Sequence, residues 1–359
     1  MAAALPTSYE AIGYTGDKNS FPLVAFSRDV PLPRSDELLI KVIGSSLNPL
    51  EFKLADLNFF GNTPPVALGF DVSGTVMAVG KDVKDYAVGD SVVAMSDCNG
   101  HGGWATGGSG GYAVAREYLS AKKPEAVSFA DAGALPVCFL AAYLGLFEHV
   151  RPGDTVYIPG GAGGVGHLAI QIAAKALGAL RVISSGSSDR SKDLILRCGA
   201  HTVLDYKQED TTQRVLELTD GRGADVVFDP TYSEHSYVAS AKAVRHGGKW
   251  VVLGVGPGRT SRTQITESPV DAILAEKSAK HINANVLNYF SRTRLIEGAT
   301  KDFLRGAMAA SMRWHVKDLV WPVISEEIVS SVEAINAGLS KLRQASGVHG
   351  KIAVNLSYR

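Results

Sequence analysis

The stretch VYIPGGAGGVGHLAIQIAAKALG, residues Val156 to Gly178, decides the fold of this chain. It opens with an apolar run, Val156 to Ile158, which is typical of a buried parallel strand. A glycine-rich turn follows, and apolar residues then recur at helical spacing at Val165, Leu168 and Ile172. The order of strand, glycine turn and helix predicts a dinucleotide-binding unit.

Three glycines of the turn satisfy the pattern G-x-G-x-x-G. We expect Gly161 to permit the tight turn, Gly163 to leave room for a pyrophosphate, and Gly166 to let the helix pack against the strand. A glycine pattern alone is weak, but the flanking strand and helix make it specific. The N–H groups at the helix start favour phosphate. The residues expected to contact the dinucleotide here are Gly161, Ala162, Gly163, Gly164, Val165 and Gly166.

Length and composition limit the class of protein. A chain of 359 residues predicts two domains or one large domain. Hydrophobic residues make up 45% and charged residues 20%, which is ordinary for a globular protein. The 36 basic and 36 acidic residues balance. The chain therefore lacks the general basic footprint of a DNA-binding or membrane-surface protein.

Cysteine usage and the N-terminus indicate the compartment. Cys98, Cys138 and Cys198 are too few and too far apart for a disulfide framework, which favours a reducing compartment. The N-terminal sequence MAAALPTSYE lacks the basic and apolar regions of a secretory signal. No run reaches the roughly 18 apolar residues of a membrane span. We expect a cytoplasmic enzyme without a membrane span.

The first third of the chain is rich in short strands broken by Pro and Gly. Leu38–Ile43, Asp71–Gly80 and Asp90–Ala94 are predicted strands, and Asn48-Pro49 begins a short helix. Such strands suggest a partly closed β-barrel or a sandwich. The glycine-rich segment 97–111 is either a surface loop or a mobile flap that brings His101 and Trp104 toward a ligand.

From Ser128 onward the pattern alternates between helices and strands. A helix capped at Ser128 is predicted to run to about His149. Four strands are predicted after the glycine turn, and their alternation with helices implies a parallel sheet covered on both faces. These strands are 181–184, 202–204, 224–229 and 249–253. Two helical segments, 294–314 and 325–343, and a final strand, 351–355, end the chain.

In this order, the elements resemble the medium-chain dehydrogenase/reductase superfamily, and more narrowly its zinc-independent quinone oxidoreductase (zeta-crystallin-like) branch. Segments that carry the resemblance run through nearly the whole chain: 46–51, 69–74, 88–92, 111–113, 134–137, 160–166, 205–206 and 247–249. The resemblance implies an α/β protein with a Rossmann domain, a doubly wound parallel sheet, over residues 129–294. A GroES-like, partly open β-barrel catalytic domain would be built from both chain ends, residues 1–128 and 295–359. It also implies a homodimer, because relatives commonly pair their Rossmann sheets edge to edge.

The resemblance also bears on zinc. Zinc-dependent relatives use a thiolate and a G-H-E motif for the catalytic metal, but the corresponding positions here are Asn48-Pro49 and Gly69-Phe70-Asp71. Those relatives hold a second zinc with four clustered cysteines, whereas only Cys98 lies in that lobe. Zn²⁺ needs about four N, S or O ligands. We expect no metal.

The second strand of the Rossmann domain indicates the cofactor. NAD-specific sites usually place Asp or Glu about 20 residues past the glycine motif, but no acid stands at this strand tip. Asp189 lies further along and is expected to cap the next helix. Hydroxyl and basic side chains would instead hold a 2′-phosphate, which selects NADPH. They are Ser185, Ser187, Arg190 and Lys192.

One alternative makes Arg190 and Lys192 merely solvated helix residues. The resemblance adds Tyr206 against the adenosine phosphate and Val255 near the nicotinamide ring. It also places a threonine on the linker helix in many relatives, where this chain has Ala141. Tyr143 or the Asn285 region would then hold the cofactor instead.

The implied chemistry is hydride transfer from the nicotinamide to an electron-poor acceptor. Without a metal, hydrogen-bond donors or solvent must stabilise the developing oxyanion. Asn48 and Lys53 are the catalytic candidates, because their segment faces the nicotinamide in relatives. The alternative is that Asn48 caps its helix and Lys53 is solvated. Asp71 is expected to order a local turn.

The resemblance implies a quinone reductase and leaves rival functions open. The same scaffold serves enoyl and alkenal reductases, including trans-acting enoyl reductases of polyketide synthases. Quinones and enones are both conjugated acceptors, so the sequence does not separate them. Zeta-crystallin-like proteins can also be NADPH-binding proteins that bind RNA. The neutral charge and the absence of a basic, aromatic-rich strip argue against RNA as the main ligand.

Overall fold

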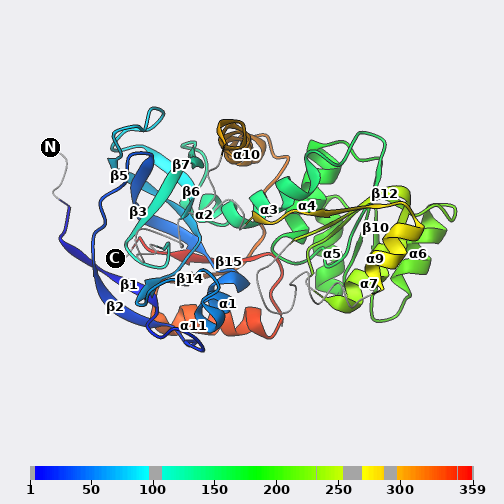
Figure 1. The fold of residues 1–359 in the computed structure, drawn as a ribbon, viewed down its shortest axis with the longest axis horizontal. Coiled ribbons are helices and arrows are strands. Elements are labelled where there is room, and N and C mark those ends of the chain that lie inside the picture. Colours follow the sequence, from blue (N-terminus) through cyan, green and yellow to red (C-terminus); the bar gives the residue numbers. More distant parts are fainter. Residues whose placement is uncertain are drawn as a thin grey trace. The chain divides into compact units, whose positions relative to one another are not determined.

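The computed structural model describes residues 5–96, 107–231, 233–253, 269–286, 297–345 and 347–357. The chain divides into two compact units (Figure 1). Unit 1 consists of Met1–Val137, Phe290–Val316 and Ile324–Arg359, and unit 2 consists of Cys138–Tyr289 and Lys317–Val323. His101, Trp104 and Val255, singled out above, lie outside the described residues.

Unit 1 is built on strands from both ends of the chain. Its strands are β1 (Ser8–Tyr14), β2 (Val24–Asp29), β3 (Glu37–Ser46), β4 (Val66–Ala67), β5 (Asp71–Val79), β6 (Ser91–Ser96), β7 (Tyr112–Lys122), β14 (Ile324–Val329) and β15 (Lys351–Asn355). Its helices are α1 (Pro49–Leu57), α2 (Phe129–Gly133), α10 (Gly298–Val316) and α11 (Val332–Arg343).

The larger sheet of unit 1 closes into a barrel. Its strand order is β14-β15-β3-β5-β6-β7, and β3 pairs with β7 as well, which closes the ring of β3, β5, β6 and β7. The last strand, β15, lies antiparallel to β3, with Ala353 opposite Ser46. The predicted β-barrel with a returning C-terminal strand is therefore confirmed.

Unit 2 is a doubly wound sheet. Its strands are β8 (Thr155–Ile158), β9 (Arg181–Ser185), β10 (Thr202–Leu204), β11 (Ala224–Asp229), β12 (Val244–Val252) and β13 (Lys280–Asn283). Its helices are most of α3 (Pro136–Leu146), α4 (Gly166–Gln171), the π-helix η1 (Ile172–Ala176), α5 (Asp189–Cys198), α6 (Thr211–Leu218), α7 (Glu234–Ala243) and α9 (Val270–Glu276). The strand order is β10-β9-β8-β11-β12-β13 and all pairs are parallel, which confirms the Rossmann prediction.

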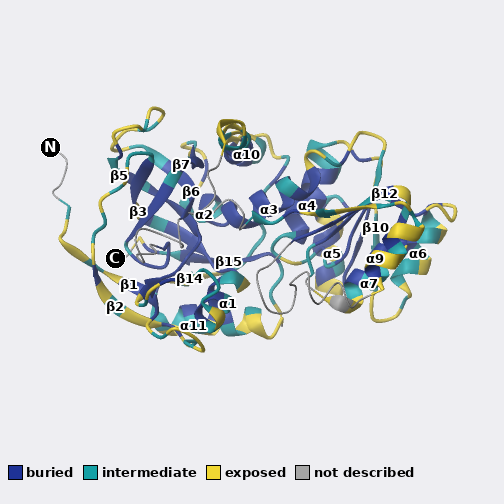
Figure 2. Cartoon of the chain, in the orientation of Figure 1, coloured by how far each residue is buried: buried dark blue, intermediate teal, exposed yellow. Residues whose placement is uncertain are grey.

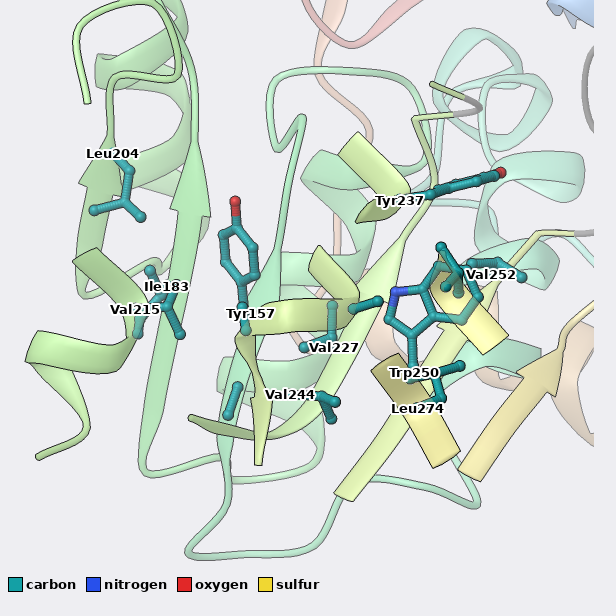
Figure 3. Close-up of a cluster of buried hydrophobic side chains, with 14 residues drawn as sticks. Tyr157, Ile183, Leu204, Val215, Val227, Tyr237, Val244, Trp250, Val252 and Leu274 are labelled. Atoms are coloured by element: carbon teal, nitrogen blue, oxygen red, sulfur yellow. The ribbon is translucent and has the colours of Figure 1, made fainter. Parts of the chain in front are cut away.

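One face of this sheet is covered by α6, α7 and α9. Trp250 is fully buried there, and Tyr237 meets it edge to face at 5.5 Å between ring centroids. Figure 3 shows this pair with Val252 and Leu274 in the same cluster. Figure 2 shows the strands of the sheet as buried and the outer sides of α6 and α9 as exposed. This pattern of burial is that of amphipathic helices, which pack their apolar face onto a sheet and leave the other face in solvent.

Two predicted helices were wrong in part. The helix predicted from Ser128 to His149 breaks into α2 and α3 before Pro136, because proline disfavours a helical conformation in the residue before it. The segment predicted as helix over 325–343 begins as a strand, since β14 pairs with β15 before α11 starts. Tertiary pairing therefore outweighed the helical pattern of this short segment.

Candidate dinucleotide site and a buried polar network

The glycine turn of unit 2 joins β8 to α4. The residue with a left-handed backbone is Gly160, with φ of +67°, so the tight turn depends on Gly160 and not on Gly161 as predicted. A Cβ added at Gly161 would lie 2.1 Å from Ser184 Oγ. Gly161 is therefore needed for close packing of the turn on β9.

The other two glycines of the motif differ in the space around them. A Cβ at Gly166 would lie 2.4 Å from the Gly160 carbonyl oxygen, so the helix start packs directly on the turn. Among the described residues, a Cβ at Gly163 would meet only that same oxygen, at 3.4 Å. The described part of the chain therefore leaves room at Gly163 for the close approach of a pyrophosphate.

Ser185, predicted as a cofactor contact, lies beneath the turn. Its Oγ accepts a hydrogen bond from Gly160 N at 3.1 Å, and its carbonyl accepts one from Gly161 N at 3.2 Å. The side chain is buried. Ser185 is the last residue of β9, and from this position it holds the glycine turn in place.

The 2′-phosphate candidates gather beyond the tip of β9. Ser187 Oγ donates to Tyr206 Oη at 3.0 Å, although the two residues are 19 positions apart in sequence. Tyr206 is half exposed and Arg190 is exposed. Within the described part of the chain, the Arg190 guanidinium has no hydrogen-bond or ion-pair partner.

Lys192 and Asp189 are placed differently from Arg190. Lys192 forms an ion pair with Asp205 at 2.8 Å, and each group shifts the other's pKa in the stabilising direction, up for Lys192 and down for Asp205. The predicted cap of the following helix was wrong by one residue. Ser188 caps α5 by accepting from Ser191 N at 3.2 Å, and Asp189 is the first helical residue.

Unit 1 contains a second set of predicted residues, in a buried polar network. Lys351 Nζ lies 2.6 Å from Asn48 Oδ1 and 3.1 Å from Asp71 Oδ2. The same Asp71 oxygen accepts from Asn48 Nδ2 at 2.8 Å and from Ser46 Oγ at 2.6 Å. Asp71 is thus the centre of a buried ion-pair network at the start of β5, and the prediction that it orders a local turn was wrong.

Glu51 joins this network from the first turn of α1. Its carboxylate accepts from Asn48 N at 2.7 Å and from Phe70 N at 3.2 Å. Burial, followed by the negative charge of Asp71, raises the pKa of Glu51 to about 7, against the opposing effect of Lys351. The network therefore contains a carboxyl group that titrates near neutral pH.

This arrangement bears on the two catalytic candidates. Asn48 is the N-cap residue of α1 and is buried, and its amide group donates toward Asp71 and Glu51. Catalysis by Asn48 stays a prediction, and its N-cap position, with its backbone N–H donating to Glu51 at 2.7 Å, agrees with the alternative role at the helix start. Lys53 lies in α1 and is half buried.

An aromatic stack runs along α3 to the residue just after its end. Tyr143 stacks on Phe147 at 4.4 Å and on Phe139 at 5.8 Å between ring centroids. Ala141 is itself buried. Within the described ranges, no three His, Cys, Asp or Glu side chains lie together in a way that would hold a metal ion.

Two buried polar residues of the helix that begins in the glycine motif, His167 and Gln171, were not singled out from the sequence. Both are fully buried on α4, where His167 Nδ1 lies 2.9 Å from the Gly163 carbonyl oxygen. Two polar residues spaced i, i+4 in an otherwise apolar helix are the signal that marks them. A buried polar side chain needs partners, so their spacing predicts a polar segment packed on that helix face.

Comparison with known proteins is consistent with this architecture. Residues 34–130 match the alcohol dehydrogenase GroES-like domain, and residues 164–292 match the zinc-binding dehydrogenase domain. A chloroplast quinone oxidoreductase of Triphysaria versicolor is 33% identical over 66% of this chain and 75% of its own length. The chain belongs to the medium-chain dehydrogenase/reductase superfamily, in its quinone oxidoreductase branch.

Other members of this oxidoreductase family extend the comparison. A 2-methylene-furan-3-one reductase of Solanum lycopersicum is 34% identical over 70% of this chain, and the chain spans 63% of its length. An NADPH-dependent alkenal/one oxidoreductase of Arabidopsis thaliana, also chloroplastic, is 32% identical over 70% of this chain and 64% of its own length. The quinone oxidoreductase structure from Coxiella burnetii has a TM-score of 0.75 at 26% identity, covering 97% of this chain and 99% of that one.

Phe70 and Asp71, which stand at the G-H-E position of zinc-dependent relatives, lie within the GroES-like match. The Asp71 oxygen that faces Lys351 already accepts three hydrogen bonds, and Phe70 cannot ligate a metal. None of the described helices combines the length and apolar character needed to cross a bilayer.

Proposed function

We propose that this protein is an NADPH-dependent oxidoreductase that passes hydride to quinones or related conjugated carbonyl compounds without zinc. The observation that carries the cofactor assignment is the exposed Arg190 guanidinium. Arg190 is three positions after Ser187, whose Oγ donates to Tyr206 Oη, and it follows a strand tip without an acid. A guanidinium with no partner among the described residues, in the same segment as hydroxyl side chains, suits the doubly charged 2′-phosphate, which NADH lacks.

The residues present suit a dinucleotide. The turn residues Gly161 to Gly166 would hold the pyrophosphate, with Gly163 leaving it space. Arg190, Ser187 and Tyr206 would hold the 2′-phosphate, and the paired Lys192 would add positive charge. When bound, NADPH would supply a hydride to the acceptor.

The Asp71 network supports a mechanism without a metal. In this network the positive charge beside the carboxylate is the Lys351 ammonium, which is itself buried. A second cation at this carboxylate would have to displace Lys351 or be repelled by it. Lys53 is the proposed hydrogen-bond donor to the reduced acceptor, with Asn48 as the second candidate.

The acceptor class follows from the relatives. Their names include a quinone, an alkenal or enone, and a methylene-furanone, and all three are carbonyl compounds conjugated with a double bond. Such acceptors take a hydride at carbon and leave negative charge on oxygen. We propose quinones first and enones second for this chain.

The test is consumption of NADPH, with NADH in parallel, against a quinone, an alkenal and an enoyl thioester. We expect turnover with the quinone or the alkenal and a clear preference for NADPH. NADPH binding without turnover of any acceptor would instead support the NADPH-binding, RNA-associated alternative. Stoichiometric zinc in active protein would overturn the metal-free mechanism.

The remaining proposals concern assembly and location. We propose a homodimer and a cytoplasmic enzyme, on the family resemblance and the sparse cysteines. Light scattering of the purified protein would test the dimer. Imaging of the full-length tagged protein would test the location, and a plastid signal would refute the cytoplasmic assignment.

A further inference from the structure

The segment Lys317–Val323 has an unusual place in the chain. It belongs to unit 2, yet α10 ends just before it at Val316 and β14 starts just after it at Ile324, and both of these elements belong to unit 1. We call Lys317–Val323 the strap. Its covalent neighbours on both sides are elements of the barrel unit.

The strap is attached by three side chains at four-residue spacing on α4 and η1, which follow the glycine motif. The Gln171 side-chain amide binds both backbone polar groups of Trp321. Its Nε2 donates to the Trp321 carbonyl at 2.9 Å, and its Oε1 accepts from the Trp321 N–H at 3.0 Å. Lys175 Nζ lies 3.8 Å from the centre of the Trp321 ring. His167 Nε2 accepts from Val323 N at 3.1 Å. Since Pro322 has no N–H, both amides that flank it are bound by α4.

His167 is the member of this set that also reaches the turn. Because Nε2 accepts from Val323, the ring proton must lie on Nδ1, which then donates to the Gly163 carbonyl at 2.9 Å. The backbone N–H of His167 donates to the same oxygen at 3.1 Å. One imidazole therefore links the middle glycine of the motif to the end of the strap.

The Gly163 carbonyl matters because it sets the direction of the next N–H. A trans peptide is planar, and its C=O and N–H point in opposite directions. Holding the Gly163 carbonyl toward the helix directs the Gly164 N–H away from the helix. That N–H then faces the side on which a helix start receives phosphate.

We propose that His167 is a positioning residue that couples the strap to the Gly163–Gly164 peptide, so that dinucleotide binding and strap attachment stabilise each other. This inference rests on the proposed NADPH-binding function. It assigns to a buried histidine a link between the cofactor turn and a segment that is covalently continuous with the other unit.

The coupling has a reciprocal consequence. If the dinucleotide stabilises the attached strap, loss of the attachment must weaken dinucleotide binding by the same factor. The strap amides Trp321 N and Val323 N report attachment directly, because each is a donor to an α4 side chain. Their hydrogen exchange should slow when NADPH binds.

The experiment compares hydrogen exchange over 317–323, with and without NADPH, in the wild-type protein and in His167→Asn. The asparagine amide can replace Nδ1–H at Gly163 but cannot reach Val323. We expect NADPH to slow exchange of the strap amides in the wild-type protein. In His167→Asn we expect that response to disappear and the NADPH Kd to rise about fivefold, as for one lost hydrogen bond.

His201→Gln is the matched control. His201 Nδ1 accepts from Val182 N at 3.0 Å in the same unit, so this variant also removes a histidine acceptor from a backbone N–H, but away from the turn. It should leave both the NADPH Kd and the strap response unchanged. If His167 had only a structural role, His167→Asn would speed hydrogen exchange of the strap equally with and without NADPH and would leave the NADPH Kd unaltered.

The outcomes separate the two proposals. Wild-type protein that binds NADPH while strap exchange stays the same would overturn the coupling alone, as would an unchanged response in His167→Asn. Wild-type protein that binds no NADPH would overturn the proposed function and the coupling with it.

Discussion

At the scale of single residues, Arg190 and Lys192 show how neighbouring cations acquire different roles. They are two positions apart on α5, yet Lys192 is paired with Asp205 and Arg190 has no partner among the described residues. The sequence alone gives both residues equal weight as phosphate ligands. Only the path of the chain after β10 brings Asp205 next to Lys192.

Replacement of Arg190 by alanine should reduce the preference for NADPH. We expect the KM for NADPH to rise roughly 10- to 100-fold, the effect of one charge-assisted hydrogen-bond set, while the KM for NADH stays close to wild type. Steady-state kinetics with both cofactors measure this. Arg197→Ala is the control, because Arg197 lies on the same helix but pairs with Asp193 at 2.9 Å. An unchanged NADPH/NADH ratio in the Arg190 variant would contradict the cofactor assignment.

Glu51 should make the stability of the protein depend on pH. Its pKa is raised to about 7 in the folded state from an ordinary value of 4.5, so the folded state holds this proton more tightly than the unfolded state. The resulting stabilisation is present below the unfolded pKa and is lost as the pH rises through about 7. The loss is on the order of 3 kcal/mol for a fully buried group.

Glu51→Gln should remove this dependence, because glutamine stays neutral. We expect the thermal midpoint of the variant, relative to wild type, to improve as the pH is raised from 5 to 8. Thermal unfolding followed by circular dichroism across that pH range measures the difference. If the two midpoints changed in parallel, the raised pKa of Glu51 would be refuted.

At the scale of elements, the strand–turn–helix of β8 and α4 needs its glycines for two separate reasons. Gly166 is required by packing, because the Gly160 carbonyl would lie 2.4 Å from an added Cβ. Packing against the described residues does not require Gly163, since its added Cβ would meet only that oxygen among them, at 3.4 Å. A glycine that the fold does not need is explained by a ligand that approaches it.

Alanine at these two positions should therefore give opposite results. Gly166→Ala should lower the free energy of unfolding by roughly 1–3 kcal/mol, the usual effect of overpacking. Gly163→Ala should keep the wild-type thermal midpoint and weaken NADPH binding by about tenfold or more. Calorimetric titration and thermal unfolding of both variants measure the contrast. Wild-type NADPH affinity in Gly163→Ala would count against a pyrophosphate at this turn.

At the scale of the whole molecule, the last strand of the chain extends the sheet that β3 begins. The terminal strand β15 lies between β14 and β3, and its residues Ile352, Ala353 and Val354 are buried. Its first residue, Lys351, supplies the ammonium of the Asp71 network. Folding of unit 1 therefore depends on residues separated by nearly the full length of the chain.

Truncation after Gly350 should abolish cooperative folding of unit 1. It removes buried aliphatic side chains, each contributing about 1.5–3 kcal/mol, and leaves the buried Asp71 carboxylate unpaired at a further cost of about 3–5 kcal/mol. That sum is comparable with the whole stability of a domain. Calorimetry should show the loss of a transition, whereas removal of Tyr358 and Arg359 alone should preserve it. A truncated protein with the wild-type transitions would contradict this dependence.

The sequence by itself determined the glycine turn and the parallel strands around it, whereas the return of the last strand to the barrel came from the family resemblance. The turn and these strands depend on the periodicity of apolar residues and on the steric role of glycine, and each is encoded within about 20 consecutive residues. Only the tertiary structure decided that Lys351 pairs with Asp71, 280 positions away, and that His167 joins Gly163 to Val323. The physical reason is that a buried polar group takes its partners from whichever segments the topology brings within hydrogen-bond distance, and no local pattern records that choice.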